Sequence, residues 1–341
     1  MATLVGILFL AALIVIHEAG HFLVARAFGM RVKKFSIGFM KPIFEWTPRG
    51  SETTYSIGAL PLGGYVQVDG LSPVDDVDPD DRANYANQPI YAKLAMIVAG
   101  PIANFLTAVI LFTALFAAGM PVPTEEPFVG RVIEGRVAHE AGLRQGDLIL
   151  SIGGEPVQGW SDIPEKIQGN RGKATVVRIR RGEEEQDVTL TPDPTSGRIG
   201  IAQATRPGEP MNVFSALGRG FTYSAVMTAG LAVMVGRMVT GQRGTEGVAG
   251  PVGIVGLLAN SLQEGWRSLF SLMAQLSISL CLFNFLPIPA LDGGRVTFLA
   301  IEGITRRRVS RKIEGYVHAV GLILVLGLVL LVTFRDVLNL L

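Results

Sequence analysis

The first apolar stretch of the chain is long enough to cross a membrane, and it carries ionisable side chains in its interior. Residues 4–27 hold almost no polar group apart from the sequence His17-Glu18-Ala-Gly-His21. About 20 apolar residues in a helix span a bilayer, and a helix places residues four apart on the same face. Ionisable groups at membrane depth are costly and usually functional. We therefore expect the two histidines to act together on one face of a transmembrane helix.

The spacing of these side chains is typical of zinc-dependent hydrolases. In a His-Glu-x-x-His helix the two imidazoles bind the metal and the glutamate acts as general base. We predict that His17 and His21 bind one catalytic Zn²⁺ and that Glu18 is the catalytic base. The residues around the motif are apolar, which indicates a metal site at membrane depth.

The rest of the composition fits a membrane protein with parts in water. The chain is 49% hydrophobic and 17% charged, and its net charge of +1 gives no reason to expect a nucleic-acid partner. Residues 213–240 contain Arg219 and Arg237, so an interfacial amphipathic helix is expected there, with a fifth span as the alternative. We predict a bundle of about four transmembrane helices. The other three predicted spans are residues 94–119, 268–290 and 316–334.

Basic residues orient the predicted spans. They follow the first span, precede the second and separate the last two: Arg26, Arg31, Lys33, Lys34, Lys93, Arg306, Arg307, Arg308, Arg311 and Lys312. Cytoplasmic loops carry an excess of Lys and Arg. The N-terminus, residues 120–265 and the C-terminus are therefore expected outside, with the zinc motif toward the cytoplasmic end of its span.

Two segments between the first and second spans lack helical character. Residues 56–68 are rich in glycine and strand-like but too short to span a membrane. They are either a surface hairpin or a re-entrant β-loop, which a membrane tolerates only where protein or water satisfies the backbone. Residues 72–82 are acidic and contain proline, which favours a solvated linker over a metal site.

Residues 127–203 have the pattern of a water-soluble α+β domain. Short strands and helices alternate with glycine turns, and two alternating strands flank Gly182. The stretch AGLRQGDLILSIGG (141–154) resembles the signature of PDZ domains. The carboxylate-binding loop usual in that family is not visible before Val129. Capture of a peptide C-terminus is therefore not indicated, whereas strand addition of a peptide remains open.

A catalytic zinc needs a third protein ligand. Asp292 lies in an apolar segment where Pro287 and Pro289 interrupt the helix and two glycines follow. It is the favoured third ligand, with an N-cap of the next helix as the alternative role. His318 is the other candidate ligand, but its position at the start of a span favours a simple interfacial histidine.

Five features occur in an order that resembles one known family. They are HEAGH (17–21), AGPIAN (99–104), one PDZ-like insert, AGPVGI (249–254) and NFLPIPALDGG (284–294). The combination resembles the site-2 protease family, and within it the bacterial regulator-of-sigma-E type of intramembrane zinc metalloprotease. The resemblance implies that His17, His21 and Asp292 are the zinc ligands and that Glu18 is the base.

The resemblance also implies how substrate is held. Asn284 would position a substrate strand, and residues 56–68 would form a membrane-associated β-structure beside the cleft. A transmembrane helix hides its carbonyl groups in its own hydrogen bonds. We therefore expect the substrate to unwind locally and to pair with this β-structure near Gly63 and Gly64.

The implied partners are single-span membrane proteins, such as an anti-sigma factor or a remnant signal peptide, and the lipid bilayer. The implied setting is regulated intramembrane proteolysis in the bacterial inner membrane, with the PDZ-like domain extracytoplasmic. Some members of this branch carry two PDZ domains, whereas this chain has room for one. The alternative functions are a membrane-anchored PDZ adaptor with a structural or vestigial zinc site, and a metal transporter, although the internal repeats of transporters are not seen.

The expected organisation follows from these features. It comprises a first helix with the zinc motif (1–28), a cytoplasmic or re-entrant β-region with the acidic linker (29–92), a second helix (93–120), the PDZ-like domain (127–203), an interfacial helix region (210–265) and the last two spans with the aspartate motif (266–341).

Overall fold

The structure is a computed structural model that describes residues 2–72, 75, 77–195, 197–241, 249–307 and 309–338. The predicted basic residue Arg308, parts of the acidic linker and residues 242–248 of the predicted interfacial region lie outside the described residues. The chain divides into two compact units, Met1–Ala117 with Met211–Leu341 and Ala118–Pro210. We describe each unit by itself.

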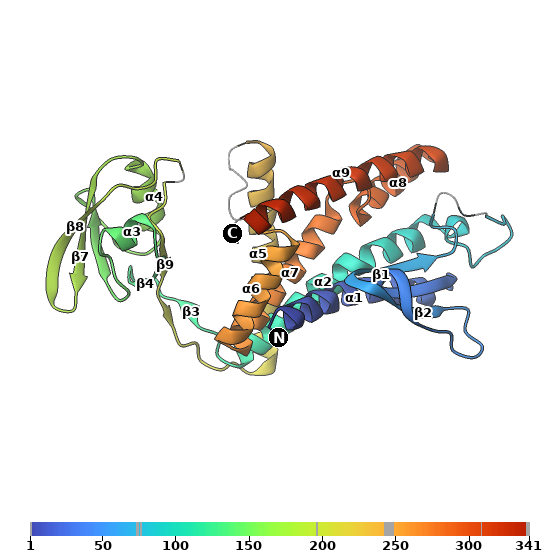
Figure 1. Ribbon diagram of the computed structural model, residues 1–341, viewed down its shortest axis with the longest axis horizontal. Coiled ribbons are helices and arrows are strands. Elements are labelled where there is room, and N and C mark those ends of the chain that lie inside the picture. Colours follow the sequence, from blue (N-terminus) through green and yellow to red (C-terminus); the bar gives the residue numbers. More distant parts are fainter. Residues whose placement is uncertain are drawn as a thin grey trace. The chain divides into compact units, whose positions relative to one another are not determined.

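The first unit is built from long apolar helices (Figure 1). Within the described residues, five helices are long and apolar enough to cross a membrane, which agrees with a multi-pass membrane protein. One of these helices, Val213–Val239, is the segment expected to be interfacial, and it forms one continuous helix. Its interfacial placement stays a prediction. The five are α1 (Ala2–Ala27), α2 (Ile90–Ala117), α5 (Val213–Val239), α7 (Trp266–Phe285) and α9 (Arg311–Leu338).

Glycine allows the first two helices to pack at very short range. A Cβ at Gly20 of α1 would lie 2.4 Å from the carbonyl oxygen of Ala99 in α2. Only a residue without a side chain fits such an approach. Nearer the N-terminal end of α1, the shorter helix α6 (Pro251–Glu264) packs against it, and Leu13 and Leu258 meet in a shared buried cluster.

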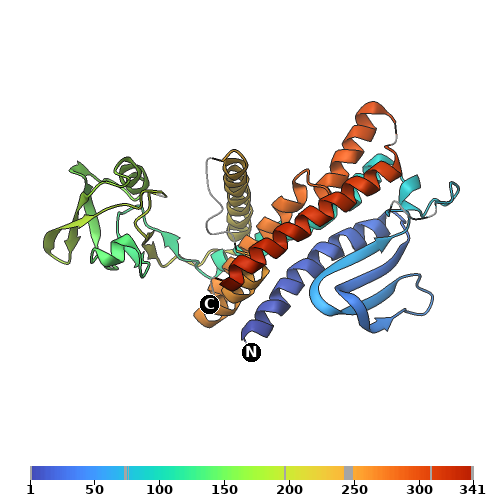
Figure 2. The same cartoon turned by 45° about the horizontal axis from the view of Figure 1, so that its top comes forward.

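An antiparallel sheet lies against α1 (Figure 2). It consists of β1 (Val32–Trp46) and β2 (Thr54–Val68), both long and bent. Ile37 of β1 pairs with Ile57 on one side and with Gly64 on the other. The first half of β1 therefore lies between the two halves of β2, and the second half of β2 is an edge of the sheet. The expected strand in residues 56–68 is confirmed, whereas β1 was not predicted.

The second unit forms a small α+β domain. Its main sheet has the order β6-β5-β7-β8, and Gly182, with φ of 64°, makes the turn between the last two strands. The elements are β4 (Val129–Val132), α3 (Val137–Glu140), β5 (Leu148–Ile152), β6 (Glu155–Pro156), α4 (Asp162–Gly169), β7 (Thr175–Arg181), β8 (Glu184–Leu190) and β9 (Ile201–Gln203). Their inward side chains form a core that includes Ile149, Ile163, Ile167 and Val177.

The chain enters and leaves this unit through a short paired stem. The strand β3 (Val122–Pro123) pairs antiparallel with β10 (Thr205–Arg206). The predicted boundaries of 127 and 203 therefore lie just inside the stem.

Candidate metal centre

Three side chains from two helices converge on one point of the first unit. His17 and His21 come from α1, and Asp292 is the first residue of α8 (Asp292–Thr305). The two Nε2 atoms are 3.2 Å apart, and Asp292 Oδ2 lies 3.2 Å from His17 Nε2 and 3.3 Å from His21 Nε2. The predicted ligands are thus brought together although Asp292 follows His21 by 271 positions in the sequence.

The spacing of the three atoms fits a tetrahedral zinc ion. Ligand atoms of such a site, with bonds of about 2.0–2.1 Å, lie about 3.3–3.4 Å apart. Asp292 Oδ2 is buried and has no hydrogen-bond partner among the described residues. Buried lone pairs directed at one another are unfavourable unless a cation lies between them. Three protein ligands also leave one position for water or substrate, which distinguishes a catalytic zinc from a structural zinc with four protein ligands.

The helix break delivers Asp292 to this point. α7 ends at Phe285 and α8 begins at Asp292, as the two prolines predict. A Cβ at Gly293 would lie 2.0 Å from the carbonyl oxygen of Leu286. The glycine is therefore needed for close packing of the helix start on the preceding loop. The alternative role of Asp292 as an N-cap is wrong, because Leu291 occupies the cap position.

The second helix orients both histidine rings. His21 Nδ1 donates a hydrogen bond of 2.8 Å to the carbonyl oxygen of Met96, which leaves the Nε2 lone pair for a metal. The amide of buried Asn104 lies 3.2 Å from His17 Nδ1. The atom within this distance is Nδ2, whereas Oδ1 has no hydrogen-bond partner among the described residues. With its amide flipped so that Oδ1 faces the ring, Asn104 accepts a hydrogen bond from His17 Nδ1–H, and His17 is oriented in the same way as His21.

Gly100 makes room for the two rings. A Cβ at this position would lie 2.3 Å from His21 Nε2 and 2.8 Å from His17 Cε1. The sequence interpretation treated AGPIAN only as part of a resemblance and missed the roles of Gly100 and Asn104. A polar Asn one turn after a Gly-Pro pair inside an apolar span was the signal that could have indicated them.

Glu18 lies in a polar cleft beside the ligands. The cleft has a volume of about 260 Å³, and its lining includes Glu18, the three ligands, Tyr65 and Asn284. The edge of β2 lies against Glu18, because Tyr65 and Val66 of this strand line the same cleft. A Cβ at Gly64 would lie 3.2 Å from Glu18 Cγ. The predicted base is therefore held between its helix and the sheet.

The other predicted site residues occupy different surroundings. Asn284 lines the cleft and donates a hydrogen bond of 2.9 Å to the carbonyl oxygen of Leu280 in its own helix. Gly63 does not line the cleft; Phe39 packs against it, and its φ is 120°. His318 is not part of the ligand cluster. The side chain of His318 is only 13% exposed, so a simple interfacial setting does not describe it.

Comparison with known proteins assigns the chain to a family. The sequence profile of Peptidase family M50 matches residues 5–328. The chain belongs to peptidase family M50. A putative zinc metalloprotease of Nostoc sp. is 36% identical over 98% of this chain and 96% of its own length. The regulator of sigma-W protease RasP of Bacillus subtilis is 29% identical, with 97% of each chain covered. A probable chloroplastic membrane metalloprotease of Arabidopsis thaliana is 32% identical, over 97% of this chain and 78% of its own length.

The family membership and the geometry agree. This M50 peptidase is an intramembrane zinc metalloprotease of the site-2 type, and its cofactor is zinc. The His17, His21 and Asp292 cluster is suited to hold that metal. The resemblance inferred from the motifs is thereby confirmed.

Proposed function

We propose that this M50 peptidase cleaves single-span membrane proteins within or near the bilayer, and that His17, His21 and Asp292 hold its zinc. The observation that carries the proposal is the convergence of these ligands and Glu18 in one polar cleft between membrane-length helices. Such a cleft allows water to reach the metal site although the surrounding helices are apolar. Soluble substrates do not require such a setting.

The residues of the chain have separate tasks in the reaction. When bound, zinc acts as a Lewis acid toward water and the scissile carbonyl group. Glu18 accepts the proton of the attacking water and returns it to the nitrogen of the leaving amine. The close approach of Gly64 to the Glu18 side chain, beside Val66 in the cleft lining, holds the carboxylate toward the cleft. Met96 and Asn104 hold the histidine rings during the cycle.

The edge of β2 is the proposed binding place for unwound substrate. Gly64 to Val68 pair with β1 on one side only, and no described strand pairs with them on the other side. An extended peptide can add to such an edge through backbone hydrogen bonds. Because the same edge touches Glu18, a strand added there would pass the cleft. Gly63 and Gly64 add no side chains at the start of this edge, and Asn284 lines the same cleft as Glu18.

The second unit is proposed to be a PDZ-like domain outside the cytoplasm. Its sheet and two helices follow the order that the signature predicts. The positions of the basic residues support a cytoplasmic location for residues 29–92 and an extracytoplasmic one for the second unit. The bacterial relatives support assigning the protein to a bacterial inner membrane. The name of the Bacillus relative, regulator of sigma-W protease, supports anti-sigma factors as one substrate class.

Cleavage by purified enzyme tests this function. A panel of single-span substrates in detergent, including an anti-sigma factor type and a signal-peptide type, is incubated with and without a zinc chelator. We expect chelator-sensitive cleavage that returns on addition of zinc, with mass spectrometry placing the cut inside or next to the apolar span. Cleavage confined to water-soluble loops, or activity unaffected by removal of zinc, would contradict the proposal. A membrane-anchored adaptor would cleave no member of the panel.

A further inference from the structure

The last long helix makes a specific contact with the loop that carries Asp292. His318 of α9 accepts a hydrogen bond of 2.9 Å at Nδ1 from the backbone N–H of Ala290. Its other nitrogen, Nε2, therefore carries the proton of the neutral ring. Nε2 lies 3.9 Å from Glu314 Oε1, one turn earlier in α9. The ring is packed beside Phe298 of α8, with 5.6 Å between the ring centroids.

Ala290 has a backbone conformation that needs external support. Its φ is +76°, in the left-handed region that residues other than glycine seldom adopt. Such residues persist where the surrounding structure holds them. Ala290 is two residues before Asp292, so its conformation sets the direction in which the chain enters α8. The hydrogen bond from Ala290 to His318 fixes this residue from the side of α9.

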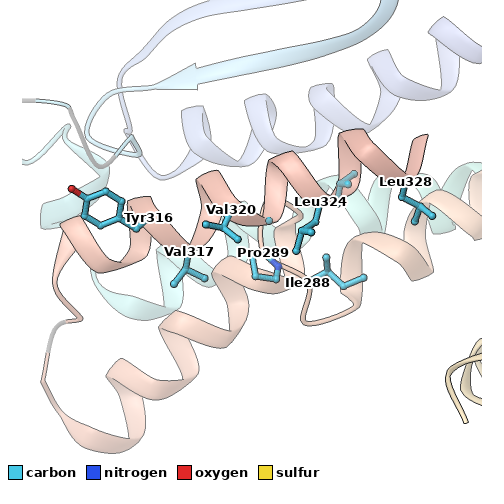
Figure 3. A pocket seen from close by; sticks show the side chains of 9 residues that line it. Ile288, Pro289, Tyr316, Val317, Val320, Leu324 and Leu328 are labelled. Atoms are coloured by element: carbon cyan, nitrogen blue, oxygen red, sulfur yellow. The ribbon is translucent and has the colours of Figure 1, made fainter. Parts of the chain in front are cut away.

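A glycine brings α9 close enough for this contact. Gly321 is one turn after His318, and a Cβ there would lie 2.4 Å from Pro289 Cβ and 2.6 Å from the Pro289 carbonyl oxygen. Figure 3 shows Pro289 and Ile288 against the face of α9 formed by Val317, Val320 and Leu324. The loop and the helix therefore meet through direct packing as well as through the hydrogen bond.

We propose that His318 is a positioning residue for the metal ligand Asp292. It acts through the Ala290 N–H: by holding this loop residue in its left-handed conformation, His318 fixes the start of α8 and with it the carboxylate of Asp292. α9 is then part of the support of the metal centre rather than only a membrane anchor. The proposal rests on the proposed role of Asp292 as the third zinc ligand.

Two substitutions at position 318 separate hydrogen bonding from packing. His318→Leu fills much of the space of the ring with an apolar, helix-favouring side chain and removes the acceptor. His318→Asn retains an acceptor, because the Asn Oδ1 atom lies close to the position of Nδ1. We expect His318→Leu to weaken zinc binding about 10-fold, the scale for loss of a partner that orients a metal ligand, and to reduce cleavage to a similar extent. His318→Asn should restore both.

A matched glycine pair in the same helix tests the contact independently. Gly321→Ala forces α9 away from Pro289, whereas a Cβ at Gly327 meets nothing within 4 Å. We expect Gly321→Ala to weaken zinc binding as His318→Leu does, and Gly327→Ala to match the wild type. Zinc affinity is measured by chelator competition on enzyme in detergent. The absorption spectrum of the Co²⁺-loaded forms reports ligand geometry, and we expect it to change in the Leu variant and to return in the Asn variant.

The outcomes distinguish this inference from the proposed ligand set. Wild-type zinc affinity and an unchanged Co²⁺ spectrum in His318→Leu, with zinc binding lost in Asp292→Ala, would overturn the positioning role alone. A folded His318→Asn enzyme as impaired as His318→Leu would also overturn it, because the acceptor would then not be the active feature. Undiminished zinc binding in Asp292→Ala would overturn the ligand assignment itself.

Discussion

Replacing Gly100 by alanine tests the idea that the close approach of α1 and α2 builds the metal centre. The added Cβ would lie 2.3 Å from His21 Nε2, 2.7 Å from His21 Cε1 and 2.8 Å from His17 Cε1. Ordinary contacts between such atoms exceed 3 Å by several tenths of an ångström, so relief requires movement of about 1 Å by a helix or a ring. Metal–ligand distances tolerate only about 0.2 Å. The two histidines therefore cannot retain their zinc geometry in this variant.

The expected magnitudes follow from this overlap. Overpacking of a tight interior costs about 1–3 kcal/mol of stability, and displaced ligands weaken zinc binding by about 10- to 100-fold. Zinc affinity, thermal unfolding and cleavage of a single-span substrate are measured on the purified variant. Gly230→Ala in α5 is the matched control, because a Cβ there has no neighbour within 4 Å. If Gly100→Ala binds zinc and cleaves as the control does, the packing argument is refuted.

Three further predictions follow from the structure. Asn104→Ala should weaken zinc binding about 10- to 100-fold, because His17 loses the partner of its Nδ1 atom, and chelator competition measures this; unchanged affinity would mean that His17 is oriented by other contacts. Burial alone raises the pKa of Asp69, but hydrogen-bonded ion pairs with Lys33 and Arg31 outweigh it and hold the pKa below its ordinary value. The stabilisation from these ion pairs is present above about pH 4 and is lost as the pH falls through the lowered pKa. Asp69→Asn should therefore lower the unfolding temperature at pH 7 by more than it does below pH 4. An equal decrease at both pH values would contradict the ion-pair argument. If the second unit excludes substrates by steric clash, replacing residues 124–204 by a Gly-Gly turn across the β3–β10 stem should preserve cleavage of a short single-span substrate. The deletion should also cleave a substrate with a bulky outward domain that the intact enzyme does not cleave. A zinc-loaded deletion that cleaves neither substrate would show that the unit is needed for productive binding.

Local patterns in the sequence predicted the features that depend on neighbouring residues. The apolar run predicted α1, the two prolines predicted the break between α7 and α8, and the Gly182 turn predicted the hairpin of β7 and β8. The metal ligands could also be predicted, because ionisable groups in apolar segments are energetically costly and are usually functional.

Features that depend on contacts between distant segments could not be predicted. β1 is a strand because both halves of β2 pair with it, and the sequence of residues 32–46 has no clear alternation. Gly100 is required because two rings from another helix lie against it. His318 was interpreted from its own helix alone, whereas its partner Ala290 is 28 residues away. In each case the decisive neighbour is remote in sequence.

The central claim is that Glu18 acts on water beside a zinc held by other residues, and Glu18→Gln tests it most directly. The substitution preserves the size of the side chain and removes its ability to accept a proton. We expect one zinc per chain, as in the wild type, with cleavage of a single-span substrate reduced at least ~100-fold, the scale for loss of a general base. Near-normal cleavage by the zinc-loaded variant would contradict the mechanism, and loss of zinc would show that Glu18 is itself needed to bind the metal.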